Sequence, residues 1–141
     1  MRTATLLSLL IGISPLAAVG ADFDGSKPLI CAQTSAQECY SGERCRSVSA
    51  EDTGIPQFLR VDVRKREITD PNSGEASEIV TVTEIDIADD HEEVLSDLLI
   101  LQGTEQGLGW SLSIARETGK MVLTAAGEAA GVVAFGACTL D

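Results

Sequence analysis

The four cysteines of this chain constrain its fold more than any other feature of the sequence. Cys31, Cys39 and Cys45 lie within fifteen residues, and Cys138 lies three residues from the last position. Zinc sites usually need cysteine pairs separated by about two to four residues, whereas the gaps here are seven and five residues. A redox C-x-x-C motif does not occur in the sequence. The spacing predicts two structural disulfides, with neither a metal site nor a redox site.

Geometry ranks the three ways in which the four cysteines can pair. A hairpin that turns at residues 41–43 places Cys39 opposite Cys45, within the reach of a disulfide. Cys31 then pairs with Cys138. The alternatives are Cys31–Cys39 with Cys45–Cys138, and Cys31–Cys45 with Cys39–Cys138. All three arrangements join Cys138 to the N-terminal cysteine region, so we expect the first and last strands to be linked.

Residues 1–21 have the pattern of a signal peptide. Arg2 gives a positive start, an apolar run follows over residues 6–16, and Val19-Gly20-Ala21 resembles a cleavage site. We expect cleavage before Asp22 and export to the periplasm or the extracellular space. An oxidising compartment of this kind favours disulfides.

The remaining residues, 22–141, are expected to form a single domain with a strongly acidic surface. Without Arg2 this part has nine Lys and Arg against 22 Asp and Glu, a net charge of −13. Such a charge repels nucleic acid, which we exclude as a partner. The apolar stretch 125–137 is short and contains Glu128, so no membrane span is expected in the mature chain. We expect a monomer or a small homo-oligomer.

Alternating apolar and polar residues predict an all-β domain. In one segment, charged residues alternate with Leu59, Val61 and Val63. In another, two serines alternate with Trp110, Leu112 and Ile114. The expected strands are 57–64, 78–87, 98–102, 110–114, 120–126 and 131–140, with a glycine-containing loop at 103–109. We expect a small antiparallel meander that closes into a barrel or a sandwich, and the link between its ends favours the barrel. With few aromatic residues, the interior should be mainly solid.

The one helical candidate is the segment 91–99, for which strand or loop is the competing prediction. Its apolar residues follow a helical stripe, and Asp90 could cap it.

The sequence contains no recognisable catalytic set. His91 is the only histidine and lies among carboxylates, and no G-x-S-x-G motif is present. The residues 70–75 and 86–93 lack EF-hand spacing. The prediction is therefore no catalytic residue, no cofactor and no metal. Acidic residues are so numerous that a carboxylate-based hydrolase is only a third hypothesis.

Two surface features are candidate interaction sites. The first is a basic patch in an acidic chain, which could bind an anion or an acidic partner, and a solvated strand face is its competing explanation. It comprises Arg60, Arg64, Lys65 and Arg66. The second is the loop 103–109, where Leu108 and the adjacent Trp110 could anchor a contact with another protein.

Five segments resemble a group of small exported bacterial proteins of unknown function. They are FDGSKPLICA (23–32), PQFLRVD (56–62), LQG (101–103), GWSLSI (109–114) and FGACT (135–139). The resemblance implies a bacterial envelope setting and no activity. We expect a non-enzymatic β module that binds a small molecule or a protein. The alternative is an inhibitor of an envelope or foreign enzyme that acts through an exposed loop.

Overall fold

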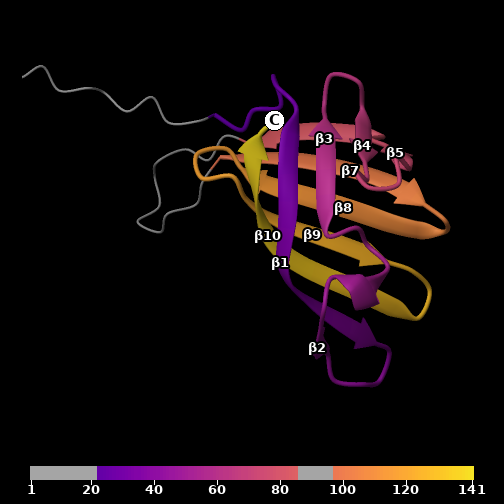
Figure 1. Cartoon of the computed structure of the whole chain (residues 1–141). Helices are drawn as coiled ribbons and strands as arrows, with labels where there is room; N and C mark the ends of the chain where they lie inside the picture. The colour runs from indigo at the N-terminus through magenta and orange to yellow at the C-terminus, as the bar shows by residue number, and fades with distance from the viewer. Residues whose placement is uncertain (1–21, 86–96) are drawn as a thin grey trace, which may run out of the picture.

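The structure is a computed structural model that describes residues 22–85 and 97–141. The predicted signal peptide, 1–21, lies outside the described residues. Within these ranges ten antiparallel strands form one sheet that curls into a half-barrel (Figure 1). The strands are β1 (Leu29–Tyr40), β2 (Arg46–Val48), β3 (Phe58–Asp62), β4 (Glu67–Thr69), β5 (Ala76–Glu78), β6 (Thr81–Ile85), β7 (Leu98–Glu105), β8 (Leu108–Ala115), β9 (Lys120–Ala126) and β10 (Ala130–Leu140). The all-β prediction is confirmed.

The first and last strands form the centre of the sheet. The strand order is β5-β4-β3-β1-β10-β9-β8-β7-β6, and β2 pairs with the far half of β1. In the β1–β10 ladder Cys31 lies directly opposite Cys138, and a disulfide joins them with 3.9 Å between their Cα atoms. The predicted link between the two ends of the domain is therefore a bond within the central ladder.

The second disulfide closes the hairpin between β1 and β2. Glu38 pairs with Arg46 in this ladder, so the next residues toward the turn, Cys39 and Cys45, face each other. Their Cα atoms are 4.2 Å apart and their sulfurs are bonded. The pairing that hairpin geometry favoured is confirmed, and the two alternative pairings are wrong. Figure 1 shows this hairpin extending beyond the rest of the sheet.

The two end strands of the sheet, β5 and β6, are neighbours along the chain. Between them, the amide of Ile79 donates to the Arg66 carbonyl at the β4 side (2.9 Å). The next amide, that of Val80, donates to the Gln102 carbonyl on β7 (2.8 Å). Successive amides of an extended strand point to opposite sides, so these two residues bridge the ends of the sheet. On the β5 side of this junction the strand pairs with β4 alone.

One contiguous hydrophobic core fills the inner side of the half-barrel. It consists mainly of aliphatic residues from every part of the sheet, and Val61, Leu99, Leu101, Leu112 and Ile114 are fully buried. Phe23, near the start of the described chain, belongs to the same core, and its amide donates to the Arg116 carbonyl at the β8–β9 turn. Its ring therefore closes that end of the half-barrel.

Two sequence predictions need correction. The segment 103–109 is not a loop, because β7 continues to Glu105 and β8 begins at Leu108. Only Gln106 and Gly107 form the turn, with φ values of 48° and 84°, as a two-residue hairpin requires. Of the helix predicted at 91–99, residues 91–96 lie outside the described residues, and residues 98 and 99 belong to β7. For those two residues the strand alternative is right, since the paired strand buries Leu99 completely.

Helical structure in the described ranges is limited to one 3-10 turn, Glu51–Thr53. Across residues 22–85 and 97–141, no helix has the length and apolar character that a membrane crossing requires.

The two disulfides should contribute unequally to stability. Cys31 and Cys138 are 107 residues apart in sequence, and Cys39 and Cys45 are six apart. Because the longer loop restricts the unfolded chain more, we expect the double variant Cys31→Ser/Cys138→Ser to lose about 5 kcal/mol and Cys39→Ser/Cys45→Ser about 2 kcal/mol. Guanidinium unfolding of the three proteins measures both losses. An equal loss in the two variants would contradict this prediction.

Candidate functional site

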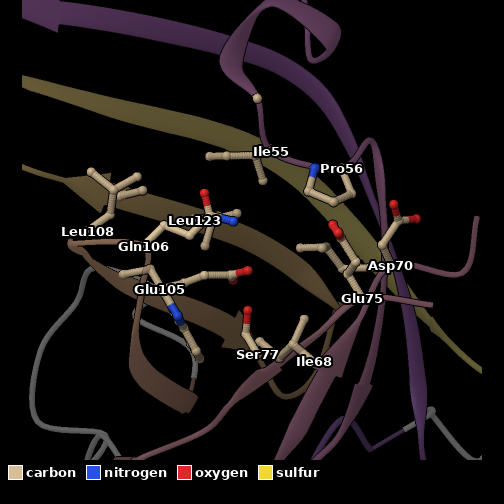
Figure 2. A pocket seen from close by; sticks show the side chains of 14 residues that line it. Ile55, Pro56, Ile68, Asp70, Glu75, Ser77, Glu105, Gln106, Leu108 and Leu123 are labelled. Carbon is tan, nitrogen blue, oxygen red and sulfur yellow. The ribbon is translucent and has the colours of Figure 1, made fainter. Parts of the chain in front are cut away.

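A cavity of about 200 Å³ is lined by residues of the segment before β3 and of β3, β4, β5, β7, β8 and β9 (Figure 2). It lies between the β4–β5 turn and the β7–β8 hairpin, and the segment before β3 covers it. Its apolar wall contains Leu59, Ile68, Trp110, Leu123 and Ala125. These residues come from four different strands, so the cavity is a product of the curled sheet and not of one local motif. It lies beside the contiguous hydrophobic core, in an interior that the sequence predicted to be mainly solid.

Polar residues gather at the mouth of the cavity. Figure 2 shows Asp70 and Glu75 on one side of it, and Glu105 and Gln106 on the other. The acids come from two separate hairpins. Although three carboxylates line one cavity, no three His, Cys, Asp or Glu side chains among the described residues group closely enough to hold a metal ion. The mouth therefore presents spread negative charge rather than a coordination site.

Asp70 is held in its ionised form by its own turn. Its carboxylate accepts hydrogen bonds from the amide of Asn72 (2.8 Å) and from the hydroxyl of Ser73 (2.9 Å). These bonds, that of Asn72 foremost, lower the pKa of Asp70 below its usual 3.8. Residues 70–75 thus form a turn that orients one charge of the cavity mouth.

A buried glutamine fixes the cover of the cavity. Gln33 on β1 is only 4% exposed, and its side-chain amide donates to the Pro56 carbonyl (2.7 Å). Its backbone amide donates to the Gln57 carbonyl (2.9 Å). Gln33 lies at a register shift of the β1–β10 ladder. Sequence reasoning did not find this residue, because its partners lie more than 20 positions away.

Trp110 lies on the cavity wall next to the junction that closes the sheet. A Cβ atom added at Gly103 would meet the Trp110 ring and the Glu78 carbonyl, so glycine is needed there. The indole Nε1 atom is buried and has no hydrogen-bond acceptor among the residues that the structure describes. Buried donors in folded proteins nearly always have a partner. Trp110 therefore contributes an aromatic surface to this site.

Leu108, the other contact residue predicted from the sequence, lies on the same hairpin. It is 43% exposed, and it also lines the cavity. A Cβ atom added at Gly127, in the turn between β9 and β10, would meet its Cδ2 atom at 2.8 Å. The structure thus brings Leu108 and Trp110 to one site, where Leu108 bridges the cavity mouth and the neighbouring turn.

The predicted basic patch is largely engaged in contacts within the protein. Arg60 pairs with Asp141 (2.7 Å), and Lys65 with Asp62 (3.6 Å). Arg66, whose φ is 57°, donates from Nε to the Ile79 carbonyl (3.0 Å) and from Nη2 to the Val80 carbonyl. Its guanidinium therefore ties β4 to the junction that closes the sheet. Arg64 is exposed.

A second polar cluster lies on the disulfide-closed hairpin. The Glu38 carboxylate accepts hydrogen bonds from Nη2 of Arg46 (2.7 Å) and from the Tyr40 hydroxyl (2.8 Å). The Arg46 guanidinium carbon lies 5.9 Å from the centre of the Tyr40 ring. The Arg46 bond, and then the Tyr40 bond, lower the pKa of Glu38 below its usual 4.5. The same bond to Glu38 raises the pKa of Tyr40 above 10.0.

Comparisons with protein-family models, with curated proteins and with solved structures found no match. The candidate site is therefore argued from its own geometry.

We expect Gly103→Ala to destabilise the protein by about 1–3 kcal/mol, because the new methyl group overlaps Trp110 and the Glu78 carbonyl. Gly109→Ala is the matched control in the paired strand. A Cβ atom there meets no atom within 4 Å, and the change should stay within about 0.5 kcal/mol. Chemical denaturation measures both values. Equal effects at the two glycines would show that this close approach is not a constraint.

We expect the Glu38 carboxyl to titrate below pH 4.5 in the folded protein. Since its folded pKa is depressed, the stabilisation from this cluster is present above the ordinary pKa and is lost as the pH falls through the lowered value. An NMR titration of the Glu38 carboxyl carbon measures the midpoint. Arg46→Gln should return that midpoint toward 4.5, and a midpoint unchanged by this variant would contradict the assigned cause.

Proposed function

We propose that the protein is an exported, non-enzymatic β module that binds a small molecule in the cavity between the β4–β5 turn and the β7–β8 hairpin. The observation that carries this proposal is the cavity itself, which is lined mainly by aliphatic and aromatic side chains together with a few polar ones. Ligand sites are commonly concave, mostly apolar and furnished with a few polar groups. The two disulfides support a setting in an oxidising compartment.

The size of the cavity restricts the ligand to a small molecule or to one small part of a larger one. An apolar cavity of about 150 Å³ accepts benzene, and this cavity measures about 200 Å³. A ligand of about eight non-hydrogen atoms, at about 0.5–1 kcal/mol for each atom, binds with a dissociation constant between about 1 mM and 1 µM. The affinity is that of a carrier or sensor for a small ligand.

Asp70 does not suit the role of the general acid in a carboxylate-based hydrolase. A carboxylate-based hydrolase needs one acid whose pKa is raised, so that it carries a proton near neutral pH. The turn around Asp70 does the opposite and lowers its pKa. The hydrogen bonds that hold Asp70 in the turn also occupy its oxygens.

Fluorescence of Trp110, the only tryptophan of the chain, gives a direct test. Titration with benzyl alcohol, a neutral single-ring probe, should change the emission in a saturable way. Ala125→Leu places a larger side chain on the cavity wall and should weaken this binding at least about tenfold. Ala126→Leu, at the exposed neighbouring position, is the matched control and should leave it unchanged. The absence of saturable binding by any single-ring probe would refute the proposal.

A further inference from the structure

We propose that the ligand of this cavity is an amphipathic cation, an amine or guanidine carried on a single ring or a short aliphatic body. This inference rests on the proposed function and adds the charge of the ligand to it. The cavity supplies two separate features, an enclosed apolar wall and a charged mouth, and one ligand must satisfy both.

The charged mouth selects the sign of the ligand. Of the fourteen residues that line the cavity, all within the described ranges, three are acidic and none is basic. Asp70 and Glu75 approach from the β4–β5 turn and Glu105 from the β7–β8 hairpin, so a ligand that enters passes between carboxylates (Figure 2). The bases near this region are engaged elsewhere, as Arg66 is with the carbonyls of Ile79 and Val80. A cation at the mouth gains from this field, and an anion is repelled.

The wall selects the rest of the ligand. Leu59, Ile68, Leu123 and Ala125 give no polar group to the interior, and they suit a ring or an alkyl chain. Trp110 adds an aromatic face, which attracts an ammonium or guanidinium group within about 6 Å of its ring.

A compact metal ion fits this arrangement less well than an extended organic cation. Metal ions need several ligands that converge on one point, and the cavity acids do not form such a group among the described residues. A charge held at the mouth and an apolar body held on the wall match the observed separation between carboxylates and aliphatic residues.

The test compares three probes of the same size that differ in charge: benzylamine, benzyl alcohol and benzoate. Each is titrated into the full mature protein at neutral pH and low salt, with Trp110 emission and backbone amide NMR shifts as readouts. We expect benzylamine to bind about three- to tenfold more tightly than benzyl alcohol, and benzoate more weakly than both. Higher salt should weaken the binding of benzylamine and leave the binding of neutral benzyl alcohol unchanged.

Charge-neutralising variants locate the effect. Glu75→Gln/Glu105→Gln should bring the benzylamine affinity to within about twofold of the benzyl alcohol affinity measured in the same variant. Asp70 is left in place because it holds its turn together. The control is Glu117→Gln, in the exposed turn at the opposite end of β8, which should leave the preference intact.

The outcomes separate this inference from the proposed function. If benzyl alcohol and benzylamine bind equally, or benzoate binds best, the cavity binds ligands but the charge preference is wrong. If Glu117→Gln removes the preference as strongly as the double variant does, the net charge of the protein and not the cavity mouth is responsible, and the inference is again wrong. If none of the three probes binds, both the proposed function and this inference are wrong.

Discussion

The pairing of the first strand with the last is the constraint on which the rest of the structure depends. β1 and β10 form the longest ladder, and the bond between Cys31 and Cys138 fixes its register. From this pair one side of the sheet continues through β3 and β4, and the other through β9, β8 and β7. Strand twist carries the two sides around until they meet at Ile79 and Val80. The half-barrel is thus fixed at its centre by a disulfide bond. Its ends are joined by the backbone hydrogen bonds that the amides of Ile79 and Val80 donate to opposite sides.

The cavity follows from how the sheet closes. The ends meet over two residues only, so β5 and the β7–β8 hairpin diverge on one side of that junction. Phe23 closes the other end of the barrel, near the β8–β9 turn. The core is built mainly from aliphatic side chains, and the gap between the diverging strands receives only part of Trp110 and Leu108. A small hollow with an apolar wall and charged hairpin tips at its mouth is the geometric result.

Much of the fold could be predicted because it depends on patterns between residues that are close in sequence. Period-two alternation located β3 and β8, and the spacing of Cys39 and Cys45 indicated their hairpin. The site could not be predicted in the same way, since its residues come from six strands, two turns and the segment before β3. The Gln33 amide and the Arg66 guanidinium bind backbone carbonyls far along the chain, and no periodicity encodes such contacts. The sequence shows that Arg66 is positively charged. Only the folded sheet shows that its guanidinium donates hydrogen bonds to the carbonyls of Ile79 and Val80. The glycines at 103–109 suggested a loop in the sequence. In the structure, the glycine at position 103 instead lies within a strand and permits the close packing of Trp110.

The junction at Ile79 and Val80 also affects how the protein meets other copies of itself. A sheet that ends in free strands offers rows of unpaired amides, on which another chain can add as a further strand and start an aggregate. Here the two end strands turn toward the same junction, and each is at most five residues long. Among the described strands, β2 also lies outside the closed order, with three residues and a charged Arg46 beside a disulfide. For a β-rich chain, joining the two ends of the sheet in this way is a protection against fibril formation.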